Sequence, residues 1–121
     1  MLLVTACLAS PVVSAAEPGQ AQGRIDRVQL LRVSEHGGED ILLLSLRDGR
    51  SFRLPGQRRL AAGPGVEVSL RYLPAGEAGE IPVACRIRVT AVPIERDGRT
   101  RLKRADRPFV VYRNSRSEHD C

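Results

Sequence analysis

Residues 41–54, ILLLSLRDGRSFRL, decide the fold, because they predict two strands joined by a tight turn. A two-residue loop would place Phe52 opposite a serine and leave the apolar face without partners. A three-residue loop, Arg47–Gly49, with Gly49 in the left-handed region followed by a bulge, avoids this mismatch. It pairs the apolar residues of the two strands: Leu44 with Phe52 and Leu42 with Leu54. We therefore expect the three-residue loop.

Further strands are predicted on both sides of this hairpin. Residues 66–72, VEVSLRY, alternate apolar and polar side chains, and residues 83–90 do the same. Residues 23–33 are rich in strand formers, but adjacent Leu30 and Leu31 interrupt the period of two, which predicts a bulge or a strongly coiled strand. The sequence thus predicts a series of short strands, each with one apolar face.

Such strands must close on themselves or pack as two sheets to cover their apolar faces. We predict an all-β fold: a small five- to six-stranded OB-like or SH3-like barrel with at most one short helix. That helix would be a single turn around Leu60-Ala61-Ala62 that plugs one end of the barrel. A chain of 121 residues has room for one core, which we place in residues 23–94. Aromatic residues make up only 3% of the chain, so this core must consist mainly of Leu, Val, Ile and Ala.

The first 16 residues carry no charge, whereas all 19 Lys and Arg and all 14 Asp and Glu follow them. An apolar run that ends in small residues is typical of a signal peptide, with residues 17–22 as a polar linker. Val4-Thr5-Ala6-Cys7 also resembles a lipobox, which makes Cys7 a lipidation candidate. A buried apolar strand is the third interpretation. The missing basic residues at the start count against both a signal peptide and a lipobox, but a cleaved signal peptide remains favoured, followed by lipidation and then by the buried strand. If the leader directs export, we expect a periplasmic protein, or one that is attached to the membrane only through a lipid anchor.

Two cysteines, Cys85 and Cys121, remain when Cys7 is removed or lipidated. An even pair in an oxidising compartment predicts a disulfide. It would close a loop of about 37 residues, which the chain-entropy model values at roughly 3–4 kcal/mol. The alternative is that Cys85 is a small buried apolar residue and Cys121 is a free thiol near the terminus. The sequence leaves both alternatives open.

Residues 95–121 predict a basic C-terminal arm with a short strand near 109–112. Six basic side chains, against three acidic ones, lie between positions 95 and 107: Arg96, Arg99, Arg101, Lys103, Arg104 and Arg107. We take them as a candidate site for an anionic envelope component or an envelope protein, the alternative being a solvated linker. The net charge of +5 supports attraction to an anion. Export and the few aromatic residues argue against a nucleic-acid partner.

Histidine, the commonest acid–base residue and metal ligand, occurs only at His36 and His119. His36 lies among acidic residues in a predicted turn, which is typical of a solvated loop. His119-Asp120-Cys121 has metal-ligand types, but so short a terminal motif often arises by chance. Phosphate loops, nucleophile elbows and zinc-protease motifs are absent from the sequence. We therefore predict a protein without enzymatic activity, with no catalytic residues, metal site or cofactor.

Three stretches carry a resemblance to known proteins: GRI at 23–25, LSLRDGRSFRLP at 44–55 and LAAGPGVEVSLRY at 60–72. Their order resembles small bacterial exported OB-fold-like domains of unknown function. Over residues 23–92 it is also similar in architecture to periplasmic copper chaperones of the CusF type. That family binds Cu(I) through methionine, histidine and tryptophan, whereas this chain has Met1 alone and no tryptophan. The resemblance therefore implies the scaffold without the metal site.

Two functions remain open from the sequence. The first is an exported, non-catalytic binding or interaction module whose basic arm meets an anionic partner. The second is a small-ligand or metal-ion carrier that uses the mouth of an OB-like barrel. The first is favoured, because the residues that a metal carrier needs are nearly missing from the chain.

Overall fold

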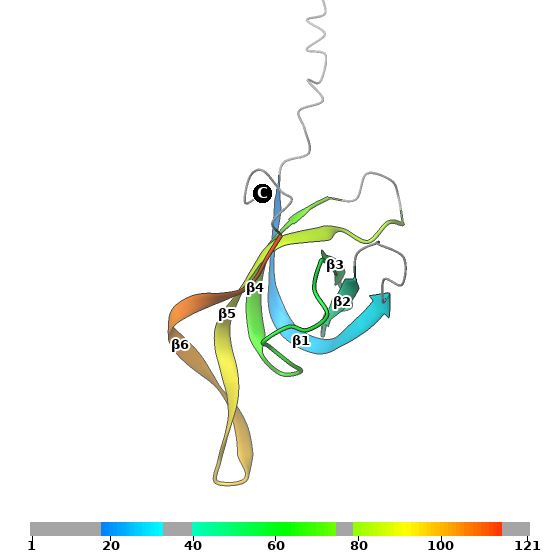
Figure 1. The fold of residues 1–121 in the computed structure, drawn as a ribbon. Coiled ribbons are helices and arrows are strands. Elements are labelled where there is room, and N and C mark those ends of the chain that lie inside the picture. The colour runs from blue at the N-terminus through cyan, green and yellow to red at the C-terminus, as the bar shows by residue number, and fades with distance from the viewer. Residues whose placement is uncertain (1–17, 33–39, 75–78, 115–121) are drawn as a thin grey trace, which may run out of the picture.

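The computed structural model describes residues 18–32, 40–74 and 79–114. These residues form six β-strands and no helix (Figure 1), which confirms the predicted all-β fold. The strands are β1 (Gly19–Arg32), β2 (Ile41–Leu46), β3 (Ser51–Pro55), β4 (Glu67–Leu73), β5 (Val83–Arg96) and β6 (Arg99–Arg113). No helix in the described ranges is long and apolar enough to cross a membrane.

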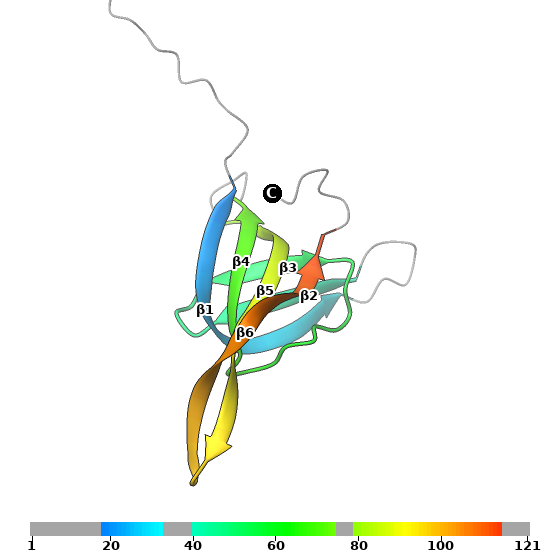
Figure 2. The same ribbon diagram turned by 90° about the vertical axis from the view of Figure 1, so that its left-hand side faces the viewer.

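The six strands form one sheet in the order β3-β2-β1-β4-β5-β6, and an additional pairing joins β3 to β5. This pairing is parallel, at Arg53 and Val83, and the Arg53 N–H donates to the carbonyl of Pro82 at 2.8 Å. Hydrogen bonds therefore pass through β1, β2, β3, β5 and β4 in a closed ring, which gives the curled, barrel-like body in Figures 1 and 2. The structure thus confirms an all-β, barrel-like body of the expected size.

The hairpin of β2 and β3 has the register that the sequence predicts. It pairs Leu44 with Phe52 and Leu42 with Leu54. Gly49 has a φ of 94° and donates its N–H to the carbonyl of Leu46 at 3.0 Å, while the Leu46 N–H donates to the carbonyl of Arg50 at 2.8 Å. A three-residue loop followed by a bulge at Gly49 is therefore present.

Strand β1 begins at Gly19, four residues before the expected start, so the supposed linker is part of the sheet from this point on. Its first half pairs with β4, from Gly19 opposite Tyr72 to Arg24 opposite Glu67. A Cβ at Gly19 would overlap the ring of Tyr72, and one at Gly23 would lie 3.2 Å from Leu46. The two glycines therefore let neighbouring side chains pack against the backbone of β1.

The second half of β1 turns away from β4 and pairs with β2. The register shifts between Ile25 and Arg27 and again between Leu30 and Arg32. The second shift confirms the irregularity expected at the adjacent leucines. Because bulges bend a strand, β1 can pair with β4 through its first half and with β2 through its second half.

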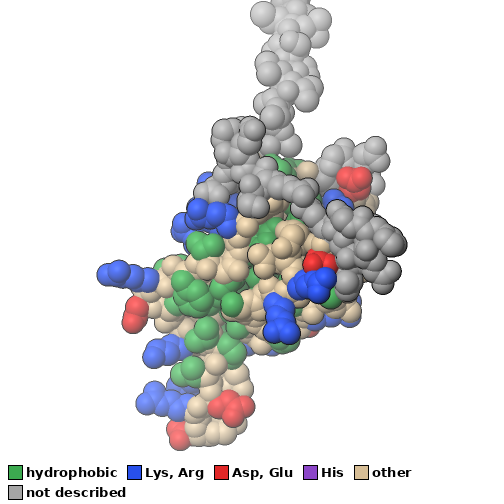
Figure 3. All heavy atoms as spheres, in the orientation of Figure 1, with side chains coloured by type: hydrophobic (Ala, Val, Ile, Leu, Met, Phe, Trp, Pro, Cys, Tyr) green, Lys and Arg blue, Asp and Glu red, His purple; other side chains and the backbone are tan. Residues whose placement is uncertain are grey.

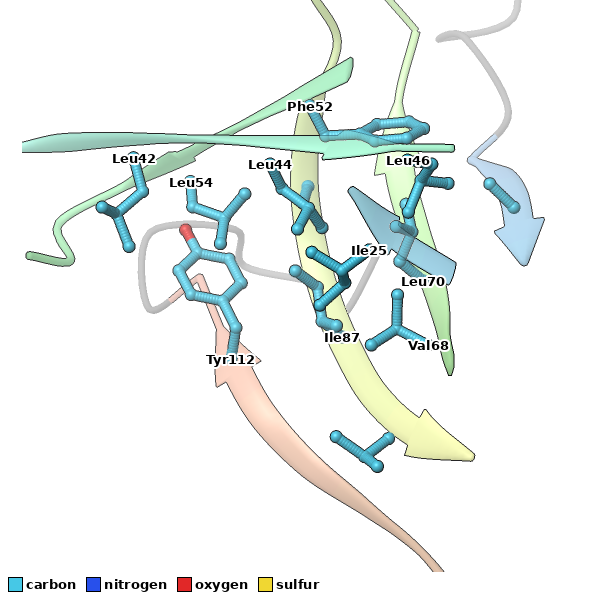
Figure 4. Packing of buried hydrophobic residues seen from close by; sticks show 13 residues of the cluster. Ile25, Leu42, Leu44, Leu46, Phe52, Leu54, Val68, Leu70, Ile87 and Tyr112 are labelled. Atoms are coloured by element: carbon cyan, nitrogen blue, oxygen red, sulfur yellow. The ribbon is translucent and has the colours of Figure 1, made fainter. Parts of the chain in front are cut away.

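The core lies inside the ring and is built mostly from aliphatic side chains, as the composition predicts. Figure 4 shows them pointing into the space between the strands. The buried cluster consists of Ala21, Ile25, Leu42, Leu44, Leu46, Phe52, Leu54, Val68, Leu70, Ala84, Ile87, Val89 and Tyr112. Tyr112 of β6 also donates its hydroxyl proton to the carbonyl of Pro55 at 2.8 Å, so β6 is fixed to the end of β3.

The connection between β3 and β4 contains no helical residues, so the predicted helical turn around Leu60-Ala61-Ala62 is wrong. Leu60 and Ala62 nevertheless pack against the core. The sequence Gly63-Pro64-Gly65 follows directly, and Gly65 has a φ of 90°. Proline and left-handed glycine end helical hydrogen bonding, so the segment covers the core as an irregular loop.

The basic C-terminal region is a β-hairpin and not a linker with one short strand. β5 continues through Pro93 to Arg96, and β6 returns from Arg99. Asp97 and Gly98 both have positive φ, 54° and 72°, which fits a two-residue turn of type I′. Residues 91–104, called the arm below, project beyond the ring in both ribbon views (Figures 1 and 2).

A wide bulge separates the arm from the rest of β6. Val89 pairs with Phe109, but Ala91 pairs with Arg104, so residues 105–108 face the single residue Thr90. Pro108 lies within this bulge and has no N–H to donate. The bulge marks the base of the arm, where the paired strands leave the barrel-like body.

Candidate anion-binding site

The described residues are much more basic than the whole chain. They contain 18 of the 19 Lys and Arg side chains but eight of the 14 Asp and Glu side chains. Their formal charge is therefore +10 (18 basic against eight acidic), compared with +5 for the full sequence. Two surfaces concentrate this charge: one face of the arm and the outer face of β4 and β5.

The arm collects four of the six predicted binding residues on one face. Directly opposite residues in an antiparallel pair share a face, as do alternate residues along a strand. The register sets Arg101 opposite Ile94 and Lys103 opposite Val92. The four basic residues of this face are all exposed and are called the basic face of the arm: Arg96, Arg99, Arg101 and Lys103.

The acidic residues of the arm do not lie on this face. Glu95 is opposite Thr100 on the other face, and Asp97 is in the turn. Figure 3 shows basic side chains along one side of the arm and acidic ones near its tip. The basic face therefore presents positive charge over two neighbouring strands without a carboxylate between.

The other two predicted residues lie elsewhere. Arg104 is opposite Ala91, and its Nη1 is 2.9 Å from Oε1 of Glu67. Arg107 is exposed in the wide bulge at the base of the arm. Of the six candidate residues, four therefore share a face, one forms an ion pair and one lies apart.

Glu67 fixes the base of the arm to the ring. Its side chain is 13% exposed, and its Oε1 accepts hydrogen bonds from Thr90 at 2.9 Å, Gln22 at 3.1 Å and Arg104 at 2.9 Å. The Thr90 hydroxyl is the main reason that the pKa of Glu67 lies below its ordinary value, and Gln22 and Arg104 lower this pKa further against the effect of burial. One carboxylate thus joins β1, β4, β5 and β6.

We expect Glu67→Gln to lower the free energy of unfolding by about 1–2 kcal/mol at pH 7, because it weakens three hydrogen bonds and removes an ion pair. Since the pKa of Glu67 is lowered from 4.5 on folding, its ionised form stabilises the fold above that pH. This contribution is lost as the pH falls through the lowered pKa. Urea denaturation from pH 7 to pH 3 should therefore show the two proteins converging in acid.

The matched control is Glu80→Gln, since Glu80 is exposed and has no hydrogen bond in the described part of the chain. It should leave the unfolding free energy within about 0.5 kcal/mol of the parent protein at every pH. A difference between Glu67→Gln and the parent that persists unchanged to pH 3 would contradict a role for the Glu67 charge.

A second basic surface was not predicted from the sequence. Arg71 of β4 is directly opposite Arg86 of β5, and Arg88 follows Arg86 on the same face. These arginines line a pocket of about 260 Å³ on the outside of the ring. The signal was present in the sequence, because Arg71, Arg86 and Arg88 occupy outward positions of two adjacent strands, but outward polar residues are expected in any half-buried strand.

Cys85 is fully buried and disulfide-bonded. Its partner lies outside the described residues, as do both Cys7 and Cys121, so the pairing with Cys121 stays a prediction. The N–H of Asn114 donates to the carbonyl of Cys85 at 2.8 Å. The chain that leads to Cys121 therefore starts beside Cys85, which is the placement that this pairing requires.

The remaining candidates have no described site. His36, His119 and the lipidation candidate Cys7 lie outside the described residues. Asp40, next to the histidine loop, forms an ion pair with Arg58, with 2.6 Å between Oδ2 and Nε. In the ranges that the structure describes, no three His, Cys, Asp or Glu side chains are grouped as metal ligands.

A second pocket, of about 250 Å³, lies beside the β2–β3 hairpin. Its lining includes Phe52, Tyr72 and Arg50. Arg50 is already bound there to the carboxylate of Asp48 and to the carbonyl of Gln22. Its charge is therefore neutralised locally, in contrast to the arginines of the first pocket.

Comparison of the chain with protein-family models, curated proteins and solved structures finds no match.

Proposed function

We propose that this protein is an exported, non-catalytic binding module of the bacterial cell envelope that holds an anionic partner through the basic face of its arm. The observation that carries the proposal is that Arg96, Arg99, Arg101 and Lys103 share one exposed face of a projecting hairpin. The uncharged leader supports export, either to the periplasm or as a lipid-anchored protein.

The spacing of the basic face suits a partner with repeated negative charges. Paired strands lie about 5 Å apart, and alternate residues along a strand are about 7 Å apart. Four cations at these spacings can engage several phosphate, sulfate or carboxylate groups together. Three of the four are arginines, whose planar guanidinium groups form paired hydrogen bonds with such oxyanions.

An apolar side chain accompanies the charge. Ile94 is on the same face and only partly buried, so it can contact the carbon skeleton of a partner. Exposed ion pairs are weak one by one and are screened by salt. Binding through this face should therefore need several contacts and should depend steeply on ionic strength.

Binding to immobilised heparin, used as a defined polyanion, tests the proposal. We expect the triple variant Arg99→Ser, Arg101→Ser, Lys103→Ser to bind about 10- to 100-fold more weakly at low salt than the parent protein. The slope of log affinity against log salt should fall by about two to three, because three fewer counterions are released.

The matched control removes the same charge from the body of the protein. Arg27, Arg47 and Arg59 are exposed and lie outside the arm, so the triple change of these residues to Ser gives an equal net charge. We expect this variant to retain nearly parental heparin affinity. Equal losses in both triple variants would show that net charge alone, and not the arm, determines binding.

The alternative of a small-ligand or metal-ion carrier acting through the barrel mouth has no specific support in the described residues. Side chains fill the interior of the ring, from Ile25 and Leu44 to Phe52 and Ile87 (Figure 4).

A further inference from the structure

We propose that the outer face of β4 and β5 carries a separate site for a single phosphate- or sulfate-type oxyanion. Its cations are Arg71, Arg86 and Arg88, and its neutral hydrogen-bonding groups are Gln20 and Ser69. This site goes beyond the proposed function of the arm, because it uses other residues and takes one compact anionic group.

The pairing of three strands brings the side chains together. Gln20 of β1 is opposite Arg71 of β4, which is opposite Arg86 of β5. Ser69 is opposite Arg88 in the next row of the same face. Neighbours lie about 5 Å apart across strands and about 7 Å apart along them. Three guanidinium groups at these distances can reach the same small anion.

The surface is hollowed at this point, and the hollow is polar. A pocket of about 260 Å³ is lined by five polar or basic residues and by Leu70, with no carboxylate among the lining residues. Pockets for drug-sized ligands are typically larger, about 300–1,000 Å³, so this one suits a compact group. Arg71 and Arg86 are half-buried, which strengthens their attraction to an anion relative to fully exposed charges.

The arrangement is unfavourable for the protein without an anion. Like charges directly opposite each other destabilise a sheet, and Arg86 has Arg71 opposite it on β4. Within the described residues, Arg71, Arg86 and Arg88 form no ion pair. A bound oxyanion would remove this repulsion, which is a physical reason for three arginines to occupy neighbouring positions.

The chemistry of the donors selects the ligand class. Guanidinium forks match the oxygen spacing of phosphate and sulfate and donate to two oxygens at once. Gln20 and Ser69 can donate to the remaining oxygens, whereas a halide offers no such separate acceptors. A doubly charged tetrahedral anion is therefore favoured over a singly charged one of similar size, because three cations surround it.

The direct test is isothermal titration of the full chain with inorganic phosphate and with sulfate at constant ionic strength. We expect saturable binding by the parent protein and at least tenfold weaker binding by Arg86→Gln, which removes the central guanidinium. The surface control Arg27→Gln and the arm variant Arg99→Ser, Arg101→Ser, Lys103→Ser should both bind as the parent does. The failure of this site and the failure of the arm can therefore be told apart.

Thermal unfolding separates a ligand site from a merely structural role. Without phosphate, Arg86→Gln should melt at the same temperature as the parent or higher, because it removes like-charge repulsion. With phosphate, only proteins that retain Arg86 should gain thermal stability, since a ligand stabilises the state that binds it. The proposal is overturned if the parent protein shows no saturable binding, or if Arg27→Gln loses as much affinity for phosphate as Arg86→Gln does. It is also overturned if phosphate raises the melting temperature of Arg86→Gln as much as that of the parent protein.

The same oxyanion could be free or part of a lipid headgroup, and vesicles distinguish the two sources. Phosphatidylcholine vesicles with and without phosphatidic acid provide the phosphomonoester on a surface. Binding that requires phosphatidic acid, is competed by free phosphate and is lost in Arg86→Gln supports the site with a headgroup as its ligand. Phosphate binding without vesicle binding supports the site with a free ligand. Vesicle binding that Arg86→Gln leaves unchanged contradicts a lipid headgroup as the ligand of this site.

Discussion

Replacing Phe52 with alanine is expected to lower the free energy of unfolding by about 3–5 kcal/mol, the cost usual for a deleted aromatic core residue. Phe52 is 2% exposed and belongs to the central cluster. Its ring centroid is 5.0 Å from that of Tyr72, so the change removes an aromatic contact as well as buried area. A loss of this size is a large part of the 5–15 kcal/mol that stabilises a typical domain.

The chain contains its own control for this prediction. Its only other phenylalanine, Phe109, is 49% exposed on β6. Phe109→Ala should reduce the unfolding free energy by about 1 kcal/mol or less, because most of the ring is already in water. Urea denaturation of both variants, with unchanged dependence on urea concentration, provides the comparison. Similar losses for the two variants would mean that the core is not where the structure places it.

The second large effect concerns the disulfide of Cys85. If Cys121 is the partner, Cys121→Ser should lower the free energy of unfolding of the oxidised protein by about 3–4 kcal/mol, since the bond closes a loop of roughly 37 residues. Reduction of the parent protein should cause a similar loss. The change at position 121 is preferred to one at Cys85, because Cys85 is fully buried and a serine hydroxyl there would add its own cost.

Cys7→Ser is the matched control, since Cys7 is the only other cysteine in the chain. We expect its unfolding free energy to equal that of the parent protein and its disulfide to remain intact by mass after alkylation. A disulfide that survives Cys121→Ser and disappears in Cys7→Ser would assign the bond to Cys7 and contradict the predicted pairing.

The parts of the fold that sequence patterns identify are those with one buried face and a defined turn. The register of β2 and β3 follows from Gly49 and from the match of Leu44 with Phe52, because a loop one residue shorter would set apolar side chains opposite polar ones. β4 is equally clear, since Val68 and Leu70 are buried between polar neighbours. In these strands the alternation of apolar and polar residues within the segment itself predicts which side chains are buried.

The start of β1 and the arm lack that local signal. Among residues 19–24 of β1 only Ala21 is buried. Gly19 and Gly23 leave room for the side chains of Tyr72 and Leu46, which are distant in sequence. Only Ala91 and Val92, at the base of the arm, are buried or packed against the core, so the composition of the rest of the arm is that of a solvated linker. The arm becomes a hairpin only because β5 and β6 pair with each other, and the pattern of residues within either strand does not show this pairing.

The candidate sites show the same division. Sequence reasoning found the basic residues of the arm from their density, but it did not separate Arg104, whose partner Glu67 is 37 positions away. It missed the pocket, because Arg71 and Arg86 meet only through the pairing of β4 with β5. Charge density is visible in one segment, whereas a site shared by several strands depends on topology.

The position of β6 in the sheet has a consequence for self-association. Among the described strands β6 pairs only with β5, so no described strand covers the other edge of its first part, before Tyr112. Such edges can recruit a second chain and start aggregation. Here an added copy would bring basic side chains against basic side chains, and Pro108 lacks an N–H to share. The charges proposed to attract an anionic partner would therefore also keep copies of the protein apart, and added salt would weaken both effects together.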